Sequence, residues 1–151
     1  MKKKLAIFWL RKDFRIKKNL ALSFASKNHH EVTVVYILKK NAFLKKREAQ
    51  IWWLHESLKN FKNELSNFNI NLELMISETF DEAFSNLLKK TPFSIYWNRV
   101  YEPEYLNFDK KISEKLKKNN IEFKIFKGNI LNEVNEVKKK DSTPYKVFTP
   151  F

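Results

Sequence analysis

The segment Leu5-Ala-Ile-Phe-Trp-Leu10, followed at once by three charged residues, is the stretch of sequence from which the fold class is read. A short, unbroken apolar run bounded by charge is typical of a strand that is buried on both faces of a sheet. A second run, Val32-Thr-Val-Val-Tyr-Ile-Leu38, is rich in β-branched residues and has the same character. Weaker runs bring the set to five predicted strands, at 5–10, 32–38, 70–76, 93–98 and 121–126.

Amphipathic segments separate these runs. Apolar residues that recur at i+3 and i+4 predict helices at 20–27, 44–68, 80–88 and 103–116. Asn19 is a candidate N-cap for the first helix, and Thr79 with Glu82 forms a capping box for the third. Pro103 suits the first turn of the fourth helix, because proline has no N–H that would need an intrahelical acceptor.

The alternation of strands and helices predicts an α/β fold. We expect a Rossmann-like, five-stranded parallel sheet in the order 3-2-1-4-5, with helices on both faces and right-handed crossovers. In such sheets ligands bind beyond the carboxyl ends of the strands, where the strand order reverses. The crevice is therefore expected between the loop after Leu10 and the loop after Trp97.

Composition excludes several kinds of site. The chain has 151 residues, about one domain, with no cysteine and a single glycine, Gly128. Disulfides, thiolate zinc sites and cysteine nucleophiles are therefore excluded. A Walker A loop, a G-x-G-x-x-G turn and a G-x-S-x-G elbow each need at least two glycines, so none of them exists here. The three histidines show no metal-ligand spacing, and no metal site is predicted.

The formal net charge of +13 has two interpretations. A basic surface attracts nucleic acid, which makes a stand-alone module for single-stranded nucleic acid one hypothesis. The excess is almost entirely lysine, with only four arginines, and arginine is the preferred reader of phosphates and bases. We therefore favour a bias in overall composition as the explanation of the charge. No apolar run approaches the roughly 18 residues of a membrane span, so we expect a cytoplasmic protein with no membrane partner.

The chain changes character after Gly128. Residues 129–141 show no clear period, and Tyr145-Lys-Val-Phe-Thr-Pro-Phe151 is aromatic and contains proline. An apolar segment of this kind usually packs against other structure. We therefore expect one domain at 1–128, with residues 129–151 either leading into further structure or folded back on this domain.

Three blocks resemble the DNA photolyase/cryptochrome family along the whole chain. Trp9-Leu-Arg-Lys-Asp-Phe-Arg15 with Asn19-Leu-Ala-Leu22 is similar to that family's first strand and loop. Tyr96-Trp-Asn-Arg-Val-Tyr-Glu-Pro103 is similar to its fourth strand and following helix start. Tyr145–Phe151 is similar to its interdomain segment, so the resemblance implies that an interdomain linker starts at 129–151. The blocks occur in the family's order and spacing.

The resemblance implies the N-terminal α/β domain of a light-driven DNA repair lyase, a deoxyribodipyrimidine photolyase that splits cyclobutane pyrimidine dimers. In the family this domain can hold an antenna chromophore, which is a folate, a deazaflavin or a flavin. A helical domain, absent from these residues, binds FAD and takes up the damaged DNA. The segment alone would then have no catalytic residues. A cryptochrome-type blue-light photoreceptor is the alternative within the same family, and a monomer is expected.

The resemblance also locates a candidate chromophore site at the carboxyl ends of the strands. In many members an arginine stands at the position of Gln50, and Arg47 lies one turn earlier on the same helix face. Glu102 and Glu104 flank Pro103 at a helix start, where they either complement the helix dipole or accept hydrogen bonds from a chromophore ring. The predicted cofactor-binding residues are Tyr36, Ile37, Leu38, Arg47, Gln50, Glu102 and Glu104.

Three charged residues follow the first strand, at Arg11, Asp13 and Arg15. They either contact a ligand in the expected crevice or form an ion-pair network that fixes the loop. We favour the network, because paired charges need no ligand to satisfy them.

Overall fold

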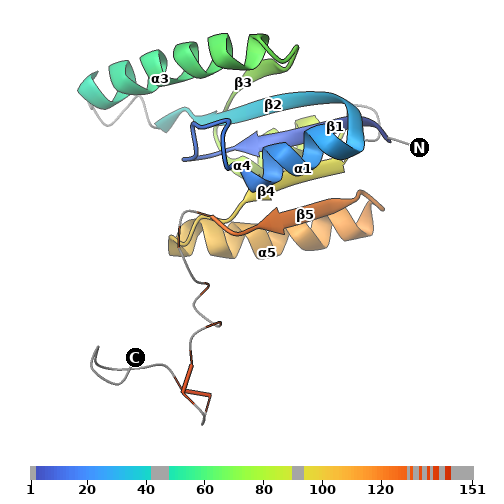
Figure 1. Cartoon of the computed structure of the whole chain (residues 1–151). Helices are drawn as coiled ribbons and strands as arrows, with labels where there is room; N and C mark the ends of the chain where they lie inside the picture. Colours follow the sequence, from blue (N-terminus) through green and yellow to red (C-terminus); the bar gives the residue numbers. More distant parts are fainter. Residues whose placement is uncertain are drawn as a thin grey trace.

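The computed structural model describes residues 3–41, 48–89 and 94–128, together with residues 130, 133, 136, 138, 139, 142 and 143. Five strands form one sheet in which every pairing is parallel and the order is β3-β2-β1-β4-β5 (Figure 1). The predicted fold class and strand order are confirmed. The strands are β1 (Lys3–Leu10), β2 (His29–Lys39), β3 (Asn71–Ser77), β4 (Ser94–Asn98) and β5 (Phe123–Phe126).

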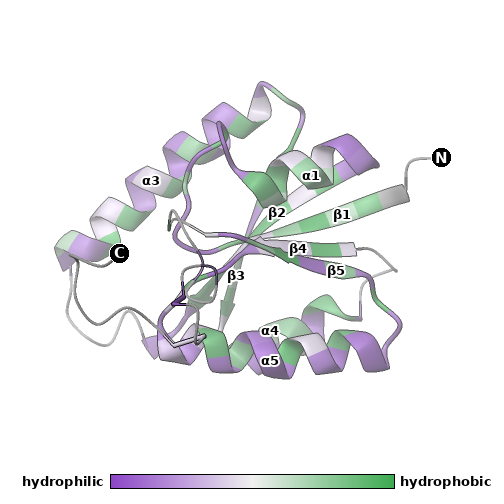
Figure 2. Ribbon diagram, turned by 60° about the horizontal axis from the view of Figure 1, so that its bottom comes forward, coloured by the Kyte–Doolittle hydropathy of each residue, from purple (hydrophilic) through white to green (hydrophobic). Residues whose placement is uncertain are grey.

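Helices cover both faces of the sheet (Figure 2). The helices named here are α1 (Leu20–Asn28), α3 (Glu48–Ser66), α4 (Phe80–Leu87) and α5 (Pro103–Lys118). Helices α1 and α3 lie on one face, and α4 and α5 lie on the other. The predicted N-cap at Asn19 is confirmed, because its side chain accepts a hydrogen bond from the Leu22 N–H. The predicted start of the long helix, at 44–47, falls outside the described residues.

The core beneath α4 and α5 is built around Trp9 of β1. Its ring meets four other aromatic rings edge-on, at centroid distances of 4.8–5.8 Å. Such edge-to-face contacts add stabilisation beyond the apolar area that they bury. Because the partners come from β4, α4 and α5, they hold these elements against the sheet. The partners are Phe80, Phe84, Trp97 and Phe108.

The opposite face of the sheet is covered by α1 and by the second half of α3. Ala21 and Ala25 of α1 are fully buried, and their small side chains let the helix lie close to β1 and β4. Phe61 and Leu65 are the buried residues of α3. The first half of α3 extends away from the sheet (Figure 2), and there the side chains of Trp52 and Trp53 are 64% and 68% exposed.

The helices in the described part of the chain all lack the combination of length and apolarity that crossing a membrane demands.

Candidate functional site at the carboxyl edge of the sheet

The point where the strand order reverses lies between β1 and β4, and the side chain of Arg11 fills it. Arg11 is 6% exposed although it directly follows β1. Its guanidinium donates to both carboxylate oxygens of Asp109 on α5, at 3.0 and 3.4 Å, and to the backbone oxygen of Asn98 at the end of β4. The hollow that remains is only about 10 Å³, room for at most one water molecule. The expected crevice is therefore not a ligand site.

Burial controls the electrostatics of this ion pair. Desolvation raises the pKa of Asp109, and the positive charge of Arg11 only partly opposes this rise. Burial likewise lowers the pKa of Arg11, against the attraction of Asp109. The guanidinium also lies 4.7 Å from the centroid of the Trp9 ring and 5.4 Å from that of Tyr105. Arg11 thus joins the core and α5 to the sheet, as the structural interpretation expects.

Asn98 organises the neighbouring loop. Its amide nitrogen donates to Asp13 at 3.0 Å and to Asn19 at 2.8 Å, and its amide oxygen accepts from the backbone N–H of Ala21 at 3.2 Å. Arg15 in turn forms an ion pair with Asp13 at 2.7 Å. The polar groups after β1 therefore bond one another and the start of α1, and the network interpretation of these charges agrees with the structure.

A larger hollow lies beside the filled crevice, over the starts of α4 and α5. Its volume is about 380 Å³, within the range of small-molecule sites. Phe80 and Phe108, which are 7% and 8% exposed, give it an apolar floor. Its rim carries both signs of charge, from Lys39, Glu78, Asp81, Glu104 and Lys111.

Two ion pairs join the start of α5 to the ends of β1 and β2, and one of them, Lys39 with Glu104, lies on the rim of this hollow. Lys39, the last residue of β2, pairs with Glu104, and Lys12 in the loop after β1 pairs with Glu102. The segment 36–38 therefore ends beside the first turn of α5. Tyr36 packs on the other face of the sheet, against Phe14, and burial, followed by the nearby Tyr105, raises the pKa of Tyr36 to about 12.

The remaining predicted residues lie apart from this group. Gln50 is exposed in the first turn of α3, which covers the other face of the sheet from α5. Arg47 falls outside the described residues. Ile37 is 6% exposed and belongs to the core under α4 and α5, so its side chain supports the edge from below. Of the predicted residues that the structure describes, Glu104 lines the hollow and Glu102 stands two residues before it, whereas Tyr36 packs on the face of the sheet that α3 covers.

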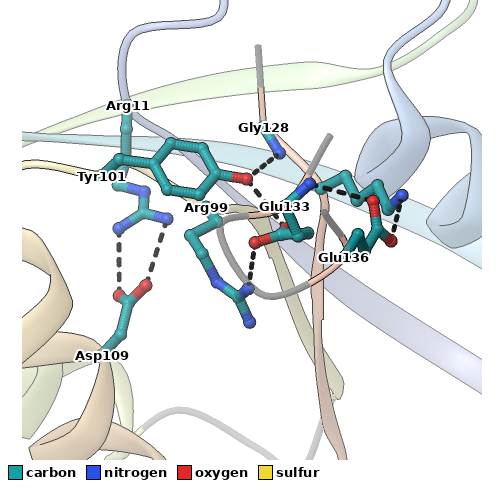
Figure 3. A network of polar contacts seen from close by, with 8 residues as sticks. Arg11, Arg99, Tyr101, Asp109, Gly128, Glu133 and Glu136 are labelled. Atoms are coloured by element: carbon teal, nitrogen blue, oxygen red, sulfur yellow. Dashed lines mark hydrogen bonds and ion pairs between the residues drawn. The ribbon is translucent and has the colours of Figure 1, made fainter. Parts of the chain in front are cut away.

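Two described residues after β5, Gly128 and Glu133, contact the loop between β4 and α5 (Figure 3). Arg99 donates to one carboxylate oxygen of Glu133 at 2.8 Å, and the hydroxyl of Tyr101 donates to the other at 2.8 Å. The backbone N–H of Gly128 donates to the same hydroxyl at 3.3 Å. Beneath these contacts lies a pocket of about 610 Å³, lined by residues that include Arg99, Tyr101, Leu106, Lys110 and Glu133.

Sequence reasoning missed three of the residues that organise this edge, which are Asn98, Asp109 and Glu133. Asp109 did leave a signal, because it stands on the buried face of α5 three residues before Ile112, where a carboxylate needs a buried partner. Glu133 left none, since it lies in a segment without periodicity. Within the ranges that the structure describes, no three acidic or histidine side chains gather closely enough to hold a metal ion.

Comparison with known proteins decides the family. The sequence model of the DNA photolyase family matches residues 6–151. The chain belongs to this family. The deoxyribodipyrimidine photo-lyase of Agrobacterium fabrum is 34% identical over 146 residues, which are 96% of this chain and 30% of that protein. Cryptochrome-2 of Arabidopsis thaliana is 26% identical over 153 residues, 98% of this chain and 24% of that protein.

Solved photolyase structures share the fold. A class III photolyase from Agrobacterium tumefaciens superposes with a TM-score of 0.84 and 32% identity, over 99% of this chain and 31% of that one. An archaeal photolyase from Sulfolobus tokodaii, a structure with two FAD molecules, gives a TM-score of 0.77 and 25% identity, over 89% and 32%. The chain therefore spans about a third or less of the length of these photolyase-family relatives. Family membership favours the photolyase/cryptochrome hypothesis over a stand-alone nucleic-acid-binding module.

Proposed function

We propose that this chain is the antenna-chromophore domain of a light-driven lyase that repairs cyclobutane pyrimidine dimers in DNA. The observation that carries the proposal is the family match over residues 6–151, together with a photolyase relative that is 34% identical. In this proposal residues 1–128 form the domain and residues 129–151 begin the linker. FAD and the damaged DNA bind to a further, helical part of the protein.

The chromophore site that the geometry supports best is the hollow at the carboxyl edge. Phe80 and Phe108 offer an apolar surface to a flat ring, and Glu104 offers a carboxylate to the N–H groups that folates and flavins carry. Lys39 and Lys111 on the same rim suit an anionic tail. These residues fit an antenna group of the folate, flavin or deazaflavin class. Glu102 would adjoin the group from the start of α5. Tyr36, Leu38, Arg47 and Gln50 remain predicted contacts only for a group that reaches past the strand ends to the α3 side of the sheet.

The bound antenna group would absorb light and pass the excitation energy onward. The part of this chain is to hold the ring in one orientation and to shield it from water. Glu104 can accept a ring hydrogen bond only by giving up or sharing its pair with Lys39, so binding and the ion pair are coupled. Glu102 is likewise paired, with Lys12, so it too can accept a ring hydrogen bond only by giving up or sharing an ion pair.

Titration with a folate, a flavin and a deazaflavin, followed by fluorescence, tests this site. We expect one of them to bind the 151-residue chain and Glu104→Gln to weaken binding about tenfold, as the loss of a charge-assisted hydrogen bond does. Glu114→Gln, an exposed change on the same helix, is the control and should leave affinity unaltered. Equal affinity of the two variants would contradict the proposed site, and no binding by any of the three ligands would contradict the antenna role.

Dimer repair under blue light tests the activity. A version extended through the proposed helical domain should bind FAD and repair dimers, whereas the 151-residue chain should do neither. Catalysis requires a pocket for the extruded lesion and a cofactor held against it. Repair by the 151-residue chain would contradict the proposal that FAD binding and repair require the helical domain.

The cryptochrome alternative rests on the match to Cryptochrome-2 of Arabidopsis thaliana over 98% of this chain. It predicts a different result in the same assay, because the extended protein would bind FAD and respond to blue light without repairing dimers.

A further inference from the structure

The only glycine of the chain stands where a side chain has no space. A Cβ atom added to Gly128 would lie 2.0 Å from the backbone oxygen of Arg99 and 3.1 Å from the Tyr101 ring. The φ angle of Gly128 is not positive, so conformational freedom does not explain the glycine. Close approach of two backbone segments explains it: the chain leaving β5 presses against the loop between β4 and α5.

Glu133 completes this contact from further along the chain. Both of its carboxylate oxygens are engaged, one by the guanidinium of Arg99 and one by the hydroxyl of Tyr101, each at 2.8 Å. The side chain of Glu133 is only 17% exposed. A half-buried carboxylate with two donors is held more firmly than a surface ion pair, which contributes little.

A local turn presents Glu133 to its two donors. The backbone N–H of Glu136 donates to the Glu133 backbone oxygen at 2.9 Å, and the Glu133 N–H donates to the carboxylate of Glu136, also at 2.9 Å. Glu136 is itself paired with Lys127 (Figure 3). Lys127, next to Gly128, is therefore joined by an ion pair to Glu136, in the same turn as Glu133.

We propose that Arg99, Tyr101, Gly128 and Glu133 form a latch that fixes the direction in which the chain leaves the α/β domain. Arg99 and Tyr101 form a receptor for one carboxylate, and Glu133 supplies that carboxylate from the segment after β5. The receptor loop also carries Glu102 and leads into α5. If the proposed function holds, the latch therefore sets the position of the following domain relative to the chromophore site.

The hydroxyl donor of the latch keeps its proton at physiological pH. Burial, and next the hydrogen bond with Glu133, raise the pKa of Tyr101, so its hydroxyl stays protonated and donates to the carboxylate.

Amide hydrogen exchange at Gly128, followed by NMR in the 151-residue chain, tests the latch. Glu133→Gln removes the negative charge that orients the Tyr101 hydroxyl, which is the acceptor of the Gly128 N–H. We therefore expect exchange of the Gly128 amide to accelerate about tenfold or more. Glu114→Gln is the matched control: it makes the same chemical change at an exposed position of α5, outside the contacts of the latch, and should change exchange less than about threefold. Equal acceleration in the two variants, or none in either, would overturn the latch.

Tyr101→Phe supplies the second arm of the test. It removes both the donor to Glu133 and the acceptor of the Gly128 N–H, so exchange should accelerate as much as in Glu133→Gln, and the double variant should add little more. Additive effects would show two independent contacts and overturn the latch. The amides of Trp97 and Ile125 in the sheet monitor folding and should exchange as in the unaltered chain. Because no chromophore or DNA is present, failure here is separate from failure of the proposed function.

Discussion

At the scale of single residues, the side chain of Arg11 occupies the place where sheets of this topology usually bind a ligand. One guanidinium bonds α5 through Asp109 and β4 through the backbone of Asn98, and it packs on the Trp9 ring. Such a buried pair is costly to break from one side, since the remaining charge has neither water nor a partner. Because Arg11 leaves almost no space in the crevice, we expect a ligand to bind in the neighbouring hollow instead.

Asp109→Asn should therefore destabilise the fold by about 3–5 kcal/mol, because it leaves the Arg11 charge buried without its counterion. Urea unfolding measures the change, with Glu114→Gln as an exposed control on the same helix that should stay within about 0.5 kcal/mol. The double variant Arg11→Met/Asp109→Leu should recover most of the loss. A cost of less than about 1 kcal/mol for Asp109→Asn would contradict this account of the pair.

Gly128→Ala should displace the segment after β5, because the new methyl group would lie 2.0 Å from a backbone oxygen that cannot swing away. We expect a loss of about 1–3 kcal/mol in stability and faster exchange of the residue-128 amide. Lys118→Ala, an exposed change at the end of α5 and away from this contact, is the control. An unaltered exchange rate and stability in Gly128→Ala would show that the approach is not tight.

At the scale of elements, the start of α4 is defined by three side chains. Thr79 accepts a hydrogen bond from the Glu82 N–H at 3.1 Å, as the capping box predicts. The carboxylate of Glu82 accepts from the Ser77 hydroxyl at 2.6 Å and from the Glu78 N–H at 3.0 Å, so it also ties the helix to the end of β3. These bonds, first that from Ser77, lower the pKa of Glu82.

A lowered pKa in the folded state makes the ionised form of Glu82 stabilising. The contribution is complete above the unfolded-state pKa, near 4.5, and is lost as the pH falls through the lower folded-state value. Glu82→Gln should therefore reduce stability at pH 7, and the difference from the unaltered chain should shrink as the pH falls below about 4.5. Unfolding curves between pH 3 and 7 measure this, with Asp81→Asn as the control. A difference that is independent of pH would contradict the assignment.

The elements were largely predictable, because each depends on local pattern. Buried apolar runs gave the strands, and Asn19, Thr79 and Pro103 gave helix starts to the residue. The prediction for β2 began at residue 32, whereas the strand begins at His29. His29 pairs with Lys3 in the sheet, and its ring is buried beside Tyr96. These contacts join distant segments, so the polar sequence of residues 29–31 gives no local sign of a strand.

At the scale of the whole molecule, the site was less predictable than the sheet. The alternation of strands and helices was sufficient for the strand order 3-2-1-4-5. The bonds that shape the edge join residues far apart in sequence, such as Arg11 with Asp109 and Lys39 with Glu104. They depend on register and helix rotation, which no local pattern contains. The closing of the crevice and the return of Glu133 were therefore visible only in three dimensions.

The net charge of +13 should give this chain weak DNA affinity without sequence preference. Binding to an undamaged duplex, measured by fluorescence anisotropy, should fall about 10³-fold between 50 and 200 mM salt if about six phosphates are contacted. Scrambling the duplex sequence should change nothing. Affinity that survives at high salt would indicate contacts other than charge.

The four tryptophans fall into two environments, and this division gives the molecule two built-in optical reporters. Trp9 and Trp97 are sealed in the core, whereas Trp52 and Trp53 project into water from α3. An indole in an apolar core emits at shorter wavelength and is sheltered from dissolved quenchers, while a solvated indole emits further to the red and is readily quenched. Low concentrations of acrylamide should therefore extinguish only the red part of the emission, and the blue part should disappear when the sheet itself comes apart.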